Sequence, residues 1–332
     1  MRPESSLNFS LTAGFRVPAR AKLASVNLLE PHHANSLSEE HQNPVTSETR
    51  PEKIWLWRLA EFIKFPHTLF ALPFALISTL VAGQGQVPPR VLGWILVCMV
   101  AARTAAMAFN RLVDWEIDKQ NPRTAQRHLL IKKPHGWMLL VVALLLFLFG
   151  TWSLNRFCFY LSPFLITVLL GYSLTKRFTA FSHAFLGLAL ALAPIGAWAA
   201  VCGELRAASP FVLAGAVLCW VFGFDLIYAT MDIAFDRAKK LFSFPAIFGL
   251  AASLRLARIL HAVATAGFCL FGWWAPLGWP YGIACAVSAI ALVWEHHIAN
   301  PKDLALINRA FFHINAMVSL LLLLGAGLSY LV

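Results

Sequence analysis

The chain has 332 residues, of which 59% are hydrophobic, and a formal net charge of +11. Soluble domains are about 45–50% apolar, so this composition excludes an ordinary soluble protein and favours a membrane protein with several spans. The basic residues lie in separate segments between apolar runs and form no continuous basic face. This distribution argues against nucleic acid as a partner and favours anionic lipid headgroups or a phosphorylated substrate.

Residues 1–52 contain much Ser, Asn, Pro and His and few aromatic residues, so we expect a flexible tail. The basic residues among the first 29 give this tail a weak resemblance to an organellar transit peptide, and an unstructured N-terminus is the alternative. Apolar and charged residues interleave from Lys53 to Phe65, which predicts an amphipathic helix on the membrane surface. The membrane domain is therefore expected to cover residues 53–332.

Apolar stretches of nearly spanning length recur from Leu69 to the C-terminus. They predict an all-α, polytopic membrane protein. The nine expected transmembrane helices are 67–84, 91–110, 136–153, 157–174, 182–202, 210–231, 257–275, 278–296 and 310–331. The segments 53–66, 111–135, 175–181, 232–256 and 297–309 carry nearly all Lys and Arg of the domain. The positive-inside rule therefore places them on the cytoplasmic face and the C-terminus across the membrane.

Acidic residues are scarce and clustered in this domain. Between Lys53 and Val332 there are ten Asp or Glu, and six of them lie in the segments 114–118 and 225–236. A carboxylate near hydrocarbon costs about 2.5–3.5 kcal/mol, so this concentration indicates a function. Four predicted spans separate the two clusters, which returns the chain to the same side and lets the clusters face each other across a central cavity.

Within each cluster the spacing places polar side chains on one face of a helix. Asn110, Asp114 and Asp118 share one stripe, with Arg103 on the same stripe seven residues earlier. In the second cluster, Asp225, Tyr228, Asp232 and Asp236 fall within one arc of the helix surface. Like charges at i, i+4 repel, but Mg²⁺ between them would explain the pattern, because it binds one or two carboxylates plus water and phosphate oxygens. Surface salt bridging is the alternative.

Basic residues accompany the clusters, and these can bind a diphosphate. They are Lys119, Arg123 and Arg127 after the first, Arg237, Lys239 and Lys240 after the second, and Lys176-Arg177 between them. Membrane topology alone is the other explanation for these residues.

Three motifs together resemble those of the UbiA-type intramembrane aromatic prenyltransferases, specifically the 4-hydroxybenzoate polyprenyltransferase group, over roughly residues 55–330. The first motif is Asn110, Asp114, Asp118 and Asn121-Pro122-Arg123-Thr124. The second is Asp225, Tyr228-Ala229, Asp232 and Asp236-Arg237. The intermediate motif is Tyr172, Lys176-Arg177 and Thr179. The chain departs from the family at two positions. It has Lys240 where relatives often have Gly, and Ala234 where many have Glu.

The resemblance implies a bundle around a cavity that opens laterally to lipid, and Mg²⁺-dependent transfer of a polyprenyl group from a polyprenyl diphosphate to an aromatic acid, most simply 4-hydroxybenzoate, in ubiquinone or menaquinone biosynthesis. It implies a metal set of Asn110, Asp114, Asp118, Asp232 and Asp236. The four aspartates and Tyr228 would be catalytic. Substrate binding would fall to Arg103, Lys119, Arg123, Tyr172, Lys176, Arg177, Asp225 and Arg237. Arg103 is the candidate partner of the acceptor carboxylate.

The expected location is the bacterial inner membrane with the site on the cytoplasmic face, and the mitochondrial inner membrane is the alternative. Two other functions stay open at this point. One is prenyl transfer to a different acceptor, such as a naphthoate-like menaquinone precursor, homogentisate or haem. The other is an ion-coupled secondary transporter, although transporter carboxylates usually lie near the membrane midplane and these lie at predicted helix ends.

Overall fold

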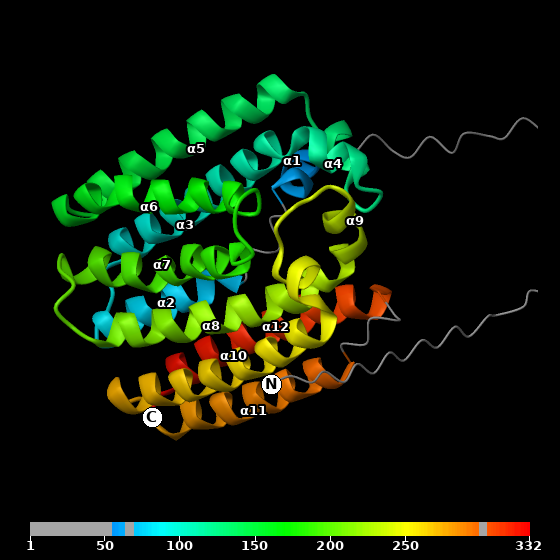
Figure 1. Cartoon of the computed structure of the whole chain (residues 1–332). Helices are drawn as coiled ribbons and strands as arrows, with labels where there is room; N and C mark the ends of the chain where they lie inside the picture. The colour runs from blue at the N-terminus through cyan, green and yellow to red at the C-terminus, as the bar shows by residue number, and fades with distance from the viewer. Residues whose placement is uncertain (1–54, 64–69, 299–303) are drawn as a thin grey trace, which may run out of the picture. The chain divides into compact units, whose positions relative to one another are not determined.

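The computed structural model describes residues 55–63, 70–298 and 304–332. The predicted tail (1–52) and the start of the first predicted span (67–69) lie outside these residues. Every regular element in the described part is helical, as predicted. Figure 1 shows the long helices side by side in a bundle, with the short helices α4 and α9 at one end.

Nine helices of the bundle each overlap one predicted span. They are α2 (Leu72–Ala82), α3 (Pro89–Val113), α5 (Lys133–Leu154), α6 (Arg156–Thr175), α7 (Ser182–Cys202), α8 (Ser209–Ala229), α10 (Phe244–Trp274), α11 (Trp279–Ile298) and α12 (Leu304–Leu328). Within the described residues, seven helices are long and apolar enough to cross a membrane, whereas α2 and the segment Phe312–Leu328 are shorter. The structure therefore supports an integral membrane protein, and nine crossings stay a prediction.

The shorter elements surround the ends of these helices. They are α1 (Trp55–Phe62), α4 (Trp115–Gln120), η2 (Ala125–Leu129), η3 (Thr230–Asp232) and α9 (Ile233–Ala238). In α1, Trp57 is exposed and Phe62 is buried against residues of α3 and α5. This one-sided burial is what an amphipathic helix requires.

Local sequence accounts for several helix boundaries. Pro occupies the first turn of α2, α3, α5, α8 and α10, where its missing N–H removes no helical hydrogen bond. Asn155 separates α5 from α6, as predicted, and its side chain accepts a hydrogen bond from the Cys158 amide at 2.8 Å. The Asn155 side chain also donates to the carbonyl of Ala199 at 2.9 Å, which ties this turn to α7.

The segment 232–256, expected to be a loop, is mostly helical. α9 occupies Ile233–Ala238, and α10 begins at Phe244, capped by the Ser243 side chain. α10 is interrupted at Gly249, whose φ of 81° is outside the helical range. The seventh predicted span begins at residue 257, whereas α10 begins at Phe244, so sequence hydropathy placed the start of the helix too late.

The centre of the bundle is α8, which packs against α7 and α10. Its Trp220 and Phe224 are buried among aromatic residues of α2 and α10, including Phe74 and Phe268. Close backbone approach brings α7 against α8, because a Cβ at Gly187 would lie 2.7 Å from the Leu218 carbonyl oxygen. Small residues at such contacts are typical of helix packing in membranes.

Candidate active site

The first acidic motif lies at a break between two helices. α3 ends at Val113, α4 starts at Trp115, and Asp114 between them has φ −93° and ψ 9°. The predicted continuous helix is therefore wrong at this residue. The hydrogen bonds from the Asp114 amide to the Asn110 carbonyl (3.1 Å) and from the Asp118 amide to the Asp114 carbonyl (2.7 Å) persist. The chain thus keeps the i, i+4 relationship of these three residues while it turns.

Asp114 is buried and paired with the intermediate motif. Only 2% of its side chain is exposed, and its Oδ2 lies 2.5 Å from Nζ of Lys176. Arg177 places Nη2 3.4 Å from Oδ1 of the same carboxylate and donates to the Val113 carbonyl at 2.6 Å. A buried carboxylate needs such partners, so the turn after α6 neutralises the first motif.

Asp118 pairs with an arginine of α3, the helix that precedes it in the chain. Its carboxylate lies 3.3 Å from Nη1 of Arg111, and both side chains are largely buried. Its carbonyl accepts a hydrogen bond from Thr124 Oγ1 at 2.9 Å, which fixes the following loop. Lys119, in contrast, pairs with the exposed Glu116 at 3.3 Å on the outer face of α4.

The second motif also interrupts its helix. α8 ends at Ala229, η3 covers Thr230–Asp232, and α9 follows, so the α-helical geometry is not continuous through the motif. Asp232 accepts hydrogen bonds from Arg123 through both carboxylate oxygens, with Nε to Oδ1 at 3.0 Å. Nδ2 of Asn121 lies 3.4 Å from the same Oδ1. Asn121 and Arg123, at the end of the first motif, therefore contact the second motif directly.

Arg123 also contacts Tyr228 at the end of α8. Its Nη1 donates to the Tyr228 hydroxyl at 2.6 Å, and its guanidinium carbon lies 5.0 Å from the ring centroid. Burial by itself lowers the pKa of Arg123, but Tyr228 and Asp232 outweigh it and raise the pKa above the usual range. Arg123 is therefore a fixed positive charge between the two motifs.

The remaining residues of the second motif bind the loop that follows it. Asp236 Oδ2 accepts a hydrogen bond from Ser243 Oγ at 2.6 Å. Arg237 Nε donates to the carbonyl of Ala246 at 2.8 Å, which directs this nitrogen to the first turn of α10. The Phe242 amide donates to the Lys176 carbonyl at 2.8 Å. This last bond joins the loop after α9 to the basic turn after α6.

His183 contacts the site and was not among the predicted site residues. His183, at the start of α7, places Nδ1 2.6 Å from Oδ2 of Asp225, and its side chain is 8% exposed. Asp225 itself was predicted as a site residue. A single histidine 42 positions away carries no spacing signal, so only the packing of α7 against α8 could reveal this pair.

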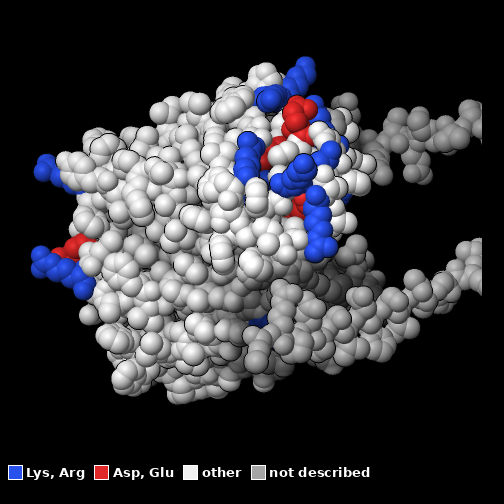
Figure 2. Space-filling model, viewed as in Figure 1, with Lys and Arg blue, Asp and Glu red and all other residues white. Residues whose placement is uncertain are grey.

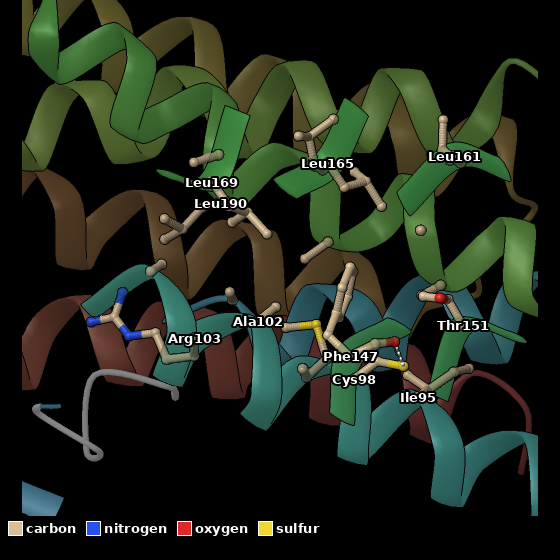
Figure 3. A pocket seen from close by; sticks show the side chains of 18 of the residues that line it. Ile95, Cys98, Ala102, Arg103, Phe147, Thr151, Leu161, Leu165, Leu169 and Leu190 are labelled. Carbon is tan, nitrogen blue, oxygen red and sulfur yellow. Dashed lines mark hydrogen bonds between the residues drawn. The ribbon is translucent and has the colours of Figure 1, made fainter. Parts of the chain in front are cut away.

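An apolar cavity adjoins this end of the bundle, between α3, α5, α6 and α7. Figure 3 shows Arg103 at one end and Thr151 at the other, with Leu161, Leu165 and Leu169 along the wall. Tyr172 also lines the cavity. The volume that the centre of a water molecule can occupy in it is about 110 Å³. The Nε of Arg103 is buried and has no hydrogen-bond partner in the described part of the chain, which suits an anionic ligand.

Together, the structure gathers most of the predicted site at one end of the bundle. Figure 2 shows Lys, Arg, Asp and Glu side chains gathered there, with a broad uncharged band separating them from the few at the opposite end. Contacts among Asp114, Lys176 and Arg177, and among Asp232, Arg123 and Tyr228, join the three motifs. Lys119 and Arg237 have other partners.

The donor set has the chemistry of a divalent-cation site. Asp114, Asp118, Asp232 and Asp236 offer carboxylate oxygens, the ligands preferred by Mg²⁺, and the first three carboxylates are paired with cationic side chains. Within the described residues, no group of three or more His, Cys, Asp or Glu side chains is already close enough to hold a metal. The residue types fit Mg²⁺, and binding it requires these carboxylates to exchange their Lys and Arg partners for the ion.

The fold and the site define an all-helical integral membrane protein whose charged residues concentrate at one end. The UbiA prenyltransferase family model matches residues 71–317. The chain belongs to this family. It is 28% identical over 278 residues to a 4-hydroxybenzoate octaprenyltransferase of Shewanella sediminis, covering 83% of this chain and 96% of the relative. It is 29% identical over 263 residues to a 4-hydroxybenzoate solanesyltransferase of Synechocystis, covering 77% and 89%.

Solved structures have the same fold. A UbiA homologue from Aeropyrum pernix superimposes with a TM-score of 0.71 and 30% identity, covering 79% of this chain and 96% of that one. A homologue from Archaeoglobus fulgidus, solved with DMAPP and Mg²⁺, gives a TM-score of 0.56 at 16% identity over 80% of this chain and 99% of that one. The second likeness concerns the fold alone.

Proposed function

We propose that this protein transfers a polyprenyl group from a polyprenyl diphosphate to 4-hydroxybenzoate in ubiquinone biosynthesis. The observation that carries the proposal is the contact of Arg123 with Asp232 and Tyr228, which joins the two acidic motifs around one charged site. The curated relatives named above support the choice of donor and acceptor. The chain is an aromatic prenyltransferase in this account, and menaquinone precursors are the alternative acceptors.

The diphosphate would bind at the charged end of the bundle. Lys176, Arg177 and Arg123, which now neutralise Asp114 and Asp232, would turn toward the phosphate oxygens, because Arg and Lys bind phosphate strongly. Mg²⁺ would be held by Asn110, Asp114, Asp118, Asp232 and Asp236, and it would supply Lewis-acid stabilisation of the diphosphate leaving group. Lys119 and Arg237 would add positive charge only after they leave their present partners.

The acceptor would lie between this site and the apolar cavity. Arg103, with its unpartnered Nε, would bind the carboxylate of the aromatic acid, and Tyr172 would line the same position. Asp225 Oδ2 lies 2.6 Å from His183 Nδ1. Asp225 would accept a hydrogen bond from the aromatic acid or take the proton that the aromatic ring loses. The apolar walls would exclude water from the allylic cation, and a lateral opening to lipid would let the polyprenyl tail remain in the membrane.

The face on which the reaction occurs follows from charge. Most Lys and Arg of the domain lie in segments at the end that carries the site. The positive-inside rule then places the site on the cytoplasmic side of a bacterial inner membrane, and a mitochondrial inner membrane is the alternative.

A membrane assay tests the function. Membranes with the wild-type protein are incubated with 4-hydroxybenzoate, a naphthoate acceptor or homogentisate, each with a polyprenyl diphosphate and Mg²⁺, and products are identified by mass spectrometry. We expect prenylated 4-hydroxybenzoate, lost in Asp114→Ala and Asp232→Ala. Full activity in both variants would contradict the proposed ligands, and a product from another acceptor alone would contradict the substrate.

A further inference from the structure

A second group of ionisable side chains is buried away from the candidate active site, between α8, α10, α11 and α12. Glu295 is 2% exposed and His261 is 3% exposed. Neither residue takes part in the proposed reaction. Ionisable side chains inside a membrane bundle are costly and indicate a function of their own, with a specific partner.

The α8 backbone fixes the proton on one nitrogen of His261. Its Nε2 lies 3.2 Å from the Trp220 carbonyl oxygen. A carbonyl only accepts hydrogen bonds, so Nε2 must carry a hydrogen. The ring occupies space that Gly223 leaves open, because a Cβ at Gly223 would lie 2.5 Å from Nε2. The orientation and the tautomer of the ring are therefore set by α8.

The other nitrogen of His261 faces Glu295. Its Nδ1 lies 3.8 Å from Glu295 Oε2, while Oε1 accepts a hydrogen bond from Asn315 Nδ2 at 2.6 Å. Nδ1 and Oε2 are both buried without another hydrogen-bond partner in the described residues. If neither carried a proton, two lone pairs would face each other in a buried site. One proton between them removes this repulsion, and a small side-chain shift brings the atoms to the usual bonding distance.

We propose that Glu295 and His261 share one proton, which resides on Glu295 as a carboxylic acid that donates to His261 Nδ1, and that this pair positions α8. Both side chains are buried away from water, and separated charges are costly in such a site. The neutral form of the pair is therefore favoured. A positive charge on His261 would also face His296, whose ring centroid is 4.9 Å away.

The pair connects the C-terminal helices to the helix of the second acidic motif. Glu295 lies on α11 and Asn315 on α12, while His261 on α10 contacts the α8 backbone at Trp220. Tyr228 lies eight residues further along α8, about 12 Å along the helix axis. Loss of the pair would let α8 shift and displace Tyr228 from Arg123. This positioning role rests on the proposed prenyl transfer, whereas the shared proton does not.

Infrared spectroscopy tests the shared proton without any assay of activity. Wild-type protein in lipid nanodiscs is compared with Glu295→Gln and His261→Ala at neutral pH. We expect a carboxylic-acid C=O band in the wild type that is absent from Glu295→Gln and moves to higher frequency in His261→Ala, where the acid loses its acceptor. A wild type without this band, together with its appearance in His261→Ala, would show an ion pair and overturn the proposal.

Kinetics test the positioning role. Glu295→Gln keeps an acceptor for Asn315 and a donor for His261, so we expect its kcat to stay within about twofold of the wild type, whereas Glu295→Ala should lower kcat at least tenfold. Ser288→Ala is the control, because it removes another buried polar group from α11. Wild-type kcat in Glu295→Ala, or equal losses in the Gln and Ala variants, would overturn the positioning role. Failure of the prenyl-transfer assay in the wild type would instead refute the proposed function and leave the infrared result intact.

Discussion

Arg123 binds Asp232 through both carboxylate oxygens, across 109 positions of sequence. Arg123 follows the first acidic motif in the chain, and Asp232 belongs to the second. The guanidinium also donates to Tyr228 at 2.6 Å. One side chain therefore connects the ends of α4 and α8, and it lies where a diphosphate would need positive charge.

The role of Arg123 can be measured by substitution. Hydrogen bonds to charged groups contribute about 1.5–3 kcal/mol, so Arg123→Ala should lower kcat/KM for prenyl transfer roughly 10- to 100-fold. Arg123→Lys keeps the charge but not the forked geometry and should recover part of this loss. Wild-type kinetics in Arg123→Ala would show that the contact has no part in the reaction.

His183 should act through Asp225. Removing the imidazole in His183→Ala leaves the carboxylate without its donor, and we expect kcat/KM to fall about tenfold. Asn can place an amide donor near the position of Nδ1, so His183→Asn should recover most of the activity. If Asn and Ala lower activity equally, the hydrogen bond to Asp225 is not the reason that His183 matters.

Arg103 should determine the affinity for the acceptor. Replacement by Leu removes the positive charge at the end of the cavity, and we expect the KM for 4-hydroxybenzoate to rise about tenfold or more. The KM for the polyprenyl diphosphate should stay unchanged. Thr151→Val, at the opposite end of the same cavity, is the control. An equal rise in both KM values for Arg103→Leu would contradict a specific role in acceptor binding.

Lys240 offers a test of stability that is separate from catalysis. Its φ is 54°, a left-handed conformation that favours glycine. Lys240→Gly should stabilise the protein by roughly 0.5–1 kcal/mol. Lys239, with φ −94°, is the matched control, and Lys239→Gly should destabilise by about the same amount. Thermal unfolding in detergent measures both, and a lower Tm for Lys240→Gly would contradict the expectation.

Sequence predicted the helical class and one overlapping span for each of the nine bundle helices, because long apolar runs favour such helices, but it placed the start of α10 too late. The break at Asn155 was also visible, since a polar residue separates two apolar runs. The breaks at Asp114 and after Ala229 could not be seen in the sequence, because the spacing of residues is helical on both sides of each break. Partners from distant helices, such as Lys176 at Asp114, hold these turns.

In the candidate site, too, some features could be predicted from the sequence and others could not. Motif spacing identified the aspartates and their basic neighbours, but it did not distinguish Arg123, which faces Asp232, from Lys119, which pairs with Glu116 on the outer face of α4. The direction of a long side chain depends on the turn that carries it. His183 was missed because its relation to Asp225 exists only after α7 packs on α8.

The most direct test is whether both acidic motifs are needed to bind one diphosphate. Calorimetry measures the Mg²⁺-dependent binding of geranyl diphosphate to the wild type, Asp114→Asn, Asp232→Asn and the control Glu116→Gln, whose exposed carboxylate pairs with Lys119. We expect either Asp variant to lose Mg²⁺-dependent binding and the control to retain it. Wild-type affinity in Asp114→Asn or Asp232→Asn would mean that one motif is sufficient and would contradict a site shared between them.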